Sequence, residues 1–288
     1  SLNIDLAASN VGGNLTVTTG NASGITDSGT VTVGGNLVAT TDANSGVINL
    51  DSMAVDGTFT LSPHSTGAVT VVNDAGLDLA ASTMGGTFSG TATTGDISDA
   101  GALAITGAAT FITGATGSNI ILDVASNAFS NSVEMRADDG SEAFGNITFV
   151  DSAAVDFDSS ASANGDLFIN ASTDGAVGGN LNVTATTGNI TQNAALTVTG
   201  TTTLTTSAND ATITLNNTSN AFTGAMTITT NDASGTDADV TIDGGTTALN
   251  IGASTIDGDL TVTSGNASGI TDSGTETVGG NLVATTDA

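Results

Sequence analysis

Short segments in which apolar and polar residues alternate recur along the whole chain. Clear examples lie at residues 15–17, 58–61, 196–198, 212–215, 226–228 and 260–262. Alternation with a period of two, carried by Val, Ile, Leu and Thr, is typical of short β-strands with one buried face. Clusters of Gly, Asn, Asp and Ser separate these segments and indicate turns. The pattern predicts an all-β protein built from many short strands.

The spacing of these strands is regular. An apolar residue that follows a turn of small residues recurs in two series, which comprise Leu15, Leu37, Phe59, Phe88 and Phe111, and then Leu181, Leu204, Met226, Leu260 and Leu282. Successive residue numbers differ by 22, 22, 29 and 23 within the first series, and by 23, 22, 34 and 22 within the second. About 22 residues with three short strands are the right size for one coil of a parallel β-helix. We interpret the two long steps, from Phe59 to Phe88 and from Met226 to Leu260, as loop insertions or a miscounted coil.

The chain also contains two long internal repeats. Residues 13–43 recur as residues 258–288 at an offset of 245 residues, and the 31 positions differ only at Asn14/Asp259, Thr19/Ser264 and Val31/Glu276. Residues 95–137 align without gaps with residues 188–230 at an offset of 93 residues. Apolar positions stay apolar in the second alignment, whereas polar positions drift among Thr, Ser, Asn and Asp. At about 22 residues per coil, the offsets correspond to about eleven and about four coils.

These patterns predict a parallel β-helix solenoid. One coil cannot bury its apolar face alone, so coils stack ~4.8 Å apart and share a narrow core. We expect residues 1–288 to form one continuous solenoid, comprising one tandem repeat of about 245 residues and the start of the next. The repeat pattern runs to the last residues without a capping element, which favours continuation into a longer array.

Composition excludes several classes of function. The formal net charge is −28, with a single Lys or Arg, and this argues against binding to nucleic acid or to anionic membranes. No apolar run approaches the ~20 residues of a membrane helix. The acidic surface is interpreted as a solvated face that keeps a long rod soluble. The alternative is Ca²⁺ binding by stacked Asp side chains, without an assigned site, and no other cofactor is expected.

The phrases GGNLTVTTGNASGITDSGTVTVGGNLVATT (12–41) and GNITQNAALTVTGTTTLTT (188–206) resemble the repeats of giant bacterial surface proteins. These are the filamentous-haemagglutinin-like exoproteins and related β-strand-repeat adhesins. The resemblance implies a right-handed parallel β-helix that is exported and displayed at the cell surface. The open ends of such a stack favour strand addition, so we expect neighbouring repeats of the same protein as partners, through end-to-end or lateral self-association. Display at the cell surface also implies contact with a host or neighbouring cell.

A few residues are candidates for chemistry. Arg136 with Asp138, Asp139 and Glu142 could form an acid/base or ion-binding pocket of a polysaccharide-acting β-helix enzyme, although a polar loop between coils explains the same residues. His64 follows Pro63 and is interpreted as a turn residue, because one His without partners does not make a metal site. The acidic residues near glycine, which include Asp74, Asp237, Asp239 and Asp243, match no Ca²⁺ motif.

The sequence therefore predicts a structural role without catalytic, cofactor-binding or metal-binding residues. The expected function is the repetitive shaft of a large extracellular, cell-surface bacterial protein, which forms a stiff fibre or an adhesin stalk. A β-helix enzyme acting on polysaccharides and a Ca²⁺-stabilised biofilm matrix protein are the alternatives.

Overall fold

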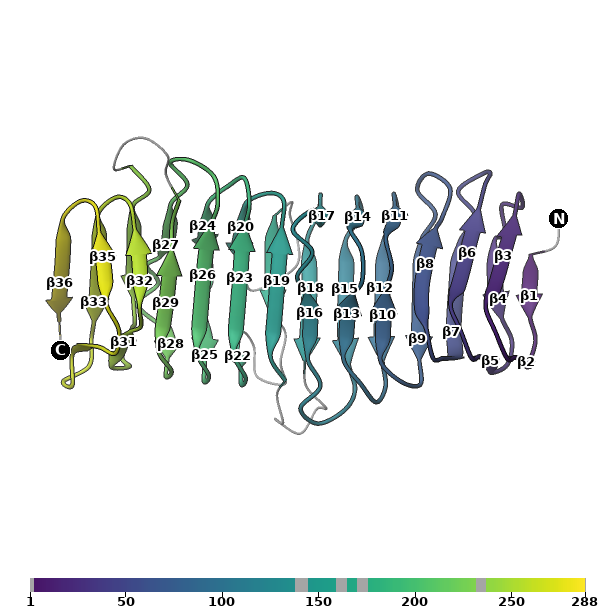
Figure 1. Cartoon of the computed structure of the whole chain (residues 1–288), viewed down its shortest axis with the longest axis horizontal. Helices are drawn as coiled ribbons and strands as arrows, with labels where there is room; N and C mark the ends of the chain where they lie inside the picture. Colours follow the sequence, from purple (N-terminus) through teal and green to yellow (C-terminus); the bar gives the residue numbers. More distant parts are fainter. Residues whose placement is uncertain (1–2, 138–144, 159–164, 170–175, 232–236, 288) are drawn as a thin grey trace.

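The protein is a rod of stacked coils. The computed structural model describes residues 3–137, 145–158, 165–169, 176–231 and 237–287, and these form about 12 turns of ~22 residues each. At the ~4.8 Å spacing of paired strands, the rod is about 60 Å long. The first and the last described residues lie at opposite ends of the rod (Figure 1). The predicted parallel β-helix is confirmed.

Two large sheets form the long walls of the rod. The strands of the 16-stranded sheet, in sequence order, are β1 (Ile4–Leu6), β2 (Ser9–Val11), β4 (Ile25–Asp27), β5 (Val31–Val33), β7 (Ile48–Val55), β9 (Val69–Asn73), β12 (Phe88–Ala92), β15 (Ala109–Thr113), β18 (Val133–Ala137), β20 (Val155–Phe157), β21 (Asp166–Ile169), β24 (Ile190–Gln192), β27 (Ile213–Leu215), β30 (Val240–Asp243), β33 (Leu260–Ser264) and β36 (Leu282–Thr286).

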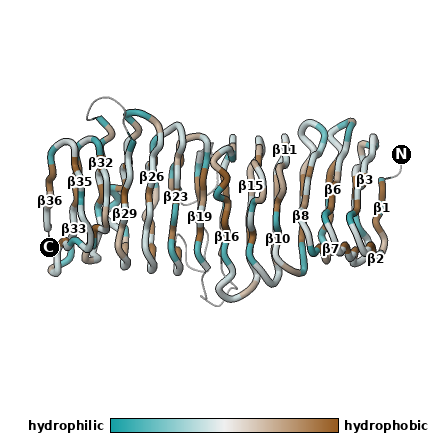
Figure 2. Tube along the Cα trace, viewed as in Figure 1, coloured by the Kyte–Doolittle hydropathy of each residue, from teal (hydrophilic) through white to brown (hydrophobic). Residues whose placement is uncertain are grey.

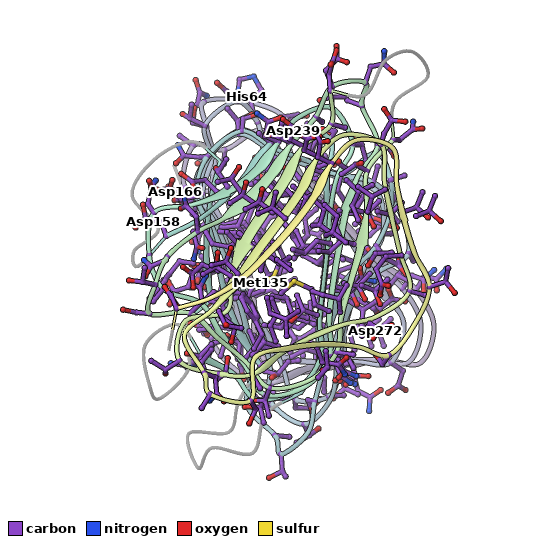
Figure 3. All side chains as sticks on the ribbon, turned by 90° about the vertical axis from the view of Figure 1, so that its left-hand side faces the viewer. His64, Met135, Asp158, Asp166, Asp239 and Asp272 are labelled. Carbon is purple, nitrogen blue, oxygen red and sulfur yellow. The ribbon has the colours of Figure 1, made fainter. Side chains whose placement is uncertain are left out.

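The 14-stranded sheet lies on the other side of the core (Figure 3). Its strands are β3 (Leu15–Thr19), β6 (Leu37–Thr41), β8 (Thr58–Ser62), β10 (Leu77–Leu79), β13 (Ile97–Asp99), β16 (Ile120–Leu122), β19 (Ile147–Asp151), β23 (Leu181–Ala185), β26 (Thr202–Thr206), β29 (Met226–Thr229), β31 (Leu249–Ile251), β32 (Ser254–Ile256), β34 (Ile270–Asp272) and β35 (Glu276–Val278).

Two small three-stranded sheets occupy corners between the large ones. One contains β11 (Ser82–Met84), β14 (Leu103–Ile105) and β17 (Ala128–Phe129), and the other contains β22 (Ala176–Val177), β25 (Thr197–Val198) and β28 (Ala221–Phe222). Neighbouring named strands pair in parallel in every sheet; β15 and β18, for example, join Phe111 to Met135. The six strand segments predicted from the alternating pattern are all present as strands.

The usual building unit is a short strand, a corner strand and a longer strand. Examples are β4–β5–β6 and β13–β14–β15, in which the short and the longer strand lie in opposite large sheets. Each unit therefore makes one full turn around the core. The turns between strands are rich in Gly, Asn and Asp, which is why hydrophilic colour gathers at the bends of the trace (Figure 2).

The core is a continuous apolar column between the sheets. Strand side chains alternate between buried and outward positions, as in β15, where Ala109, Phe111 and Thr113 point inward. Met135 lies in the interior in the view along the axis (Figure 3). Four phenylalanines stack in the middle of the rod. Their ring centroids are 5.1 Å apart for Phe88–Phe111, 6.1 Å for Phe111–Phe129 and 5.1 Å for Phe129–Phe149, which is the range of favourable aromatic pairs.

Each of the two long steps in the sequence contains an extra strand that the sequence did not predict. The step from Phe59 to Phe88 contains the single strand β9, and the step from Met226 to Leu260 contains β30. Each single strand adds half a turn, so the apolar anchor moves from the 14-stranded to the 16-stranded sheet. The step from Phe59 to Phe88 is therefore neither a loop insertion nor a whole miscounted coil. In the step from Met226 to Leu260, residues 232–236 lie outside the described residues, so a loop insertion in addition to β30 stays a prediction there.

Candidate interaction surface

The open face at the C-terminal end of the rod is the most distinctive surface of the described residues. The core opens there into a hollow of about 230 Å³, lined by apolar residues that include Leu260, Val262, Ile270 and Leu282. Leu282 is 59% exposed and Val283 is 49% exposed, whereas apolar side chains in the interior of the rod are almost fully buried. An unpaired sheet edge above an open apolar core is a surface on which further strands can add.

The chain shows how the same sequence is covered elsewhere. Strand β36 (Leu282–Thr286) has the sequence LVATT, which is also the sequence of β6 (Leu37–Thr41). Strand β8 pairs with β6 and places Phe59 opposite Leu37 and Leu61 opposite Ala39. Leu37 is consequently 0% exposed. A turn with the sequence of residues 44–62 therefore fits the face that β36 presents.

A polar side chain at the same face matches one that bonds the next turn elsewhere in the chain. Asp27 accepts hydrogen bonds from the backbone N–H groups of Asp51 (2.9 Å) and Ser52 (2.8 Å) in the next turn. Burial raises the pKa of Asp27, and these hydrogen bonds partly offset that shift. Asp272 occupies the equivalent position in the repeat and lies near the open end (Figure 3). Its carboxylate is placed to accept the same two hydrogen bonds from an added turn.

One difference between the two copies falls on this face. Glu276 stands at the position of Val31, which is 0% exposed and lies in register between Ser9 and Met53. The Oε1 atom of Glu276 is buried and has no hydrogen-bond partner among the described residues. An ionised carboxylate at an apolar position lowers stability, and burying it further increases the cost.

A ladder of Asp and Asn side chains lies at the bends that precede successive strands of the 14-stranded sheet. Asp96 Oδ1 accepts a hydrogen bond from the N–H of Asn119, Asn119 Oδ1 from Asn146, and Asn146 Oδ1 from Asn180, at 2.7–2.8 Å. The ladder ends where Asn180 Oδ1 accepts a hydrogen bond from the N–H of Thr201. Each side chain satisfies a backbone donor of the following turn, so the bends stack in register as well as the strands.

The candidates for catalysis are not assembled into a site by the described residues. Arg136 lies on β18 at an outward, half-buried position. Asp138, Asp139 and Glu142 lie outside the described residues, so the acid/base pocket remains a hypothesis. His64 lies in the connection between β8 and β9, where its N–H donates to Thr41 Oγ1 (2.8 Å) and its Nδ1 accepts from the N–H of Ser45 (3.3 Å). This is the predicted turn position.

The acidic residues near glycine take part in turns. Asp243 Oδ1 accepts a hydrogen bond from the N–H of Gly245 at 2.7 Å, and Asp239 Oδ1 accepts one from the N–H of Asp259 at 2.8 Å. Within the described ranges, no group of three or more His, Cys, Asp or Glu side chains is arranged to hold a metal ion. The Ca²⁺ alternative stays a prediction without a site.

Two buried carboxylates near corner strands were not predicted from the sequence. Asp99 accepts hydrogen bonds from the N–H of Asp123 (2.9 Å) and the side chain of Asn127 (2.6 Å), and burial raises its pKa. Asp151 is 2% exposed and accepts hydrogen bonds from the N–H groups of Phe129 and Ala153. Burial raises the pKa of Asp151 to about 6. Both side chains bond backbone N–H groups of neighbouring strands or turns, which assigns them a structural role.

Comparisons with known proteins identify a family. The model of a family described as repeats of unknown function (DUF5649) matches residues 1–64, 66–136, 144–229 and 237–288. The chain belongs to this family, because the four matches cover most of its length. No curated protein and no solved structure matches the chain. Among the described residues, no helix has the length and apolarity needed to cross a membrane.

Proposed function

We propose that the chain is part of the structural shaft of a large extracellular, cell-surface bacterial protein, and that it forms a stiff fibre or an adhesin stalk. The tandem repeats and the β-solenoid are compatible with a structural repeat protein. The finer assignment to a filamentous-haemagglutinin-like adhesin rests on the resemblance of the repeat sequences. In this proposal the chain has no catalytic role.

The identity of β36 and β6 supports the proposal of a repeat array. The C-terminal face presents the sequence LVATT of β6, which in the same chain is covered by β8. The partner expected on this face is therefore another turn of the same family of repeats, joined either along the chain or end to end. Parallel hydrogen-bond ladders and one shared core make such a stack stiff along its axis.

An extension of the chain tests this proposal. The sequence of residues 44–62 is appended after Ala288, and the control carries Phe59→Asp and Leu61→Asp in the appended copy only. The native extension is expected to raise the melting temperature and to protect the backbone amides of β36 from hydrogen exchange, because it covers Leu282 and Ala284 as β8 covers Leu37 and Ala39. The proposal is wrong if both extensions leave β36 equally exposed.

A further inference from the structure

The two copies of the repeat formed by residues 13–43 and 258–288 lie on opposite walls of the rod. Strands β3 and β6 belong to the 14-stranded sheet, but their counterparts β33 and β36 belong to the 16-stranded sheet. The short strand is exchanged in the same way, since β4 lies in the 16-stranded sheet and β34 in the 14-stranded sheet. The repeated sequence thus returns on the other side of the core.

The shorter-range repeat behaves in the same way. Residues 95–137 and 188–230 align at an offset of 93 residues. The first copy contains β13 and β15, and the second contains the counterparts β24 and β26. Strand β13 lies in the 14-stranded sheet and β24 in the 16-stranded sheet, whereas β15 and β26 show the reverse assignment. Two independent repeats therefore change side.

Single strands cause the change of side. Strand β31 is the counterpart of β1 in the next repeat. The described strands between them form nine three-part units and the single strands β9, β19 and β30. In this count, the continuous strand β7 serves as both a short and a corner strand. Each unit is a full turn and each single strand is half a turn, which makes about ten and a half turns. This refines the predicted figure of about eleven. Strand β20 is an additional strand that pairs with β21 in the same sheet and does not alter the side.

Polar side chains, two buried and one half-buried, end each run of corner strands at these points. After the corner half of β7, Asn73 Oδ1 accepts from the N–H of Val55 (2.9 Å) and Asn73 Nδ2 donates to the carbonyl of Val55 (3.0 Å). After β17, Asp151 Oδ1 accepts from the N–H of Phe129 (3.2 Å). After β28, Thr247 Oγ1 accepts from the N–H of Phe222 (3.1 Å). Each side chain bonds backbone that a further corner strand would otherwise pair.

The family matches have the same boundaries. The match to residues 1–64 holds three units, and the match to residues 66–136 begins just before β9 and holds three more. The match to residues 144–229 begins just before β19, and the match to residues 237–288 begins just before β30. A single strand followed by three units spans three and a half turns.

We propose that the repeat of this family is a half-integral number of turns, so that successive repeats present the same surface on opposite sides of the solenoid. A partner that recognises one repeat, including a second copy of this chain, then meets its binding surface alternately on the two walls. In the repeat that begins at residue 13, the outward Thr16 and Thr18 of β3 reappear as Thr261 and Thr263 of β33. The same sequence is therefore presented once on each of the two large sheets.

Distances between pairs of spin labels test this geometry in the intact chain, which contains no Cys. Four half-buried, outward-facing residues are replaced in pairs: Ser98→Cys and Thr203→Cys in the 14-stranded sheet, and Thr110→Cys and Thr191→Cys in the 16-stranded sheet. The equivalent pairs, Thr110 with Thr203 and Ser98 with Thr191, are in opposite sheets. The control pairs, Thr110 with Thr191 and Ser98 with Thr203, share a sheet and are each four strands apart.

The control pairs are expected at roughly 20 Å, which is four strand spacings. The equivalent pairs are expected at roughly 30 Å. The ~10 Å between packed sheets, lengthened by both outward label arms, lies at right angles to an axial separation similar to that of the control pairs. Whole-turn repeats would reverse this order and overturn the proposal. Each position occurs in one short and one long pair, so a distortion at one label cannot produce the full pattern. The distances are independent of cellular location and of fibre formation, so the proposed shaft function can fail while this geometry holds.

Discussion

Replacing Asn73 by alanine should loosen the first change of side. The side chain is 0% exposed, and its amide bonds the N–H and the carbonyl of Val55 and the carbonyl of Gly76 (2.6 Å). Val55 is itself only 2% exposed, so water does not readily replace these bonds. An unsatisfied buried donor or acceptor costs about 1–3 kcal/mol, which gives roughly 2–6 kcal/mol for the two Val55 groups together.

The assay for Asn73→Ala is hydrogen exchange combined with urea unfolding. Because solenoids can open locally, exchange of the Val55 N–H is the more direct measurement. The control Asn49→Ala removes a similar side chain from an outward position of β7 and should change stability by less than about 0.5 kcal/mol. The reasoning is refuted if Asn73→Ala unfolds like the control and leaves the Val55 amide as protected as in the unmodified chain.

Three further predictions concern charge. The pKa of Asp151 is raised to about 6 from 3.8, so protonation of this carboxyl favours the folded state. Its contribution to the free energy of unfolding, roughly 3 kcal/mol, is complete below pH 3.8 and is lost as the pH rises through 6. Asp151→Asn should therefore be more stable than the unmodified chain at pH 8 and lose this advantage at pH 4, as measured by urea unfolding at both pH values. If the two proteins differ in stability by the same amount at both pH values, the raised pKa of Asp151 is contradicted. Glu276→Val should stabilise the C-terminal turn by about 1 kcal/mol or more, since Val31 is fully buried at the equivalent position, and hydrogen exchange of β35 that does not slow would count against it. Removing divalent cations with a chelator should leave the melting temperature unchanged, whereas a clear decrease would favour the Ca²⁺ alternative.

The sequence was sufficient to predict the strands, the coil of about 22 residues and the parallel stacking. These features depend on local alternation and on repetition, and both are visible in the residues themselves. Leu15 and Leu260, for example, both begin a strand with the same pattern. The placement of such equivalent strands in opposite sheets was not predicted. The step from Phe59 to Phe88 gives the number of extra residues, but it does not show that they form a strand in the opposite sheet.

The polar side chains that end the corner runs could not be predicted from composition. Asn and Asp are frequent throughout the chain, so nothing marks Asn73 or Asp151 before the backbone places them against Val55 and Phe129. Glu276 was visible as one of three differences between the repeats, but its significance depends on the burial of Val31. The face formed by β36 could have been inferred from the identity of residues 37–41 and 282–286.

The most direct test of the tandem shaft is cryo-electron microscopy of the native, undigested protein. The account predicts fibres with a ~4.8 Å axial repeat, in which the sequence unit recurs about every 50 Å on alternate sides and the full structural period is about 100 Å. Short discrete rods with capped ends would contradict it.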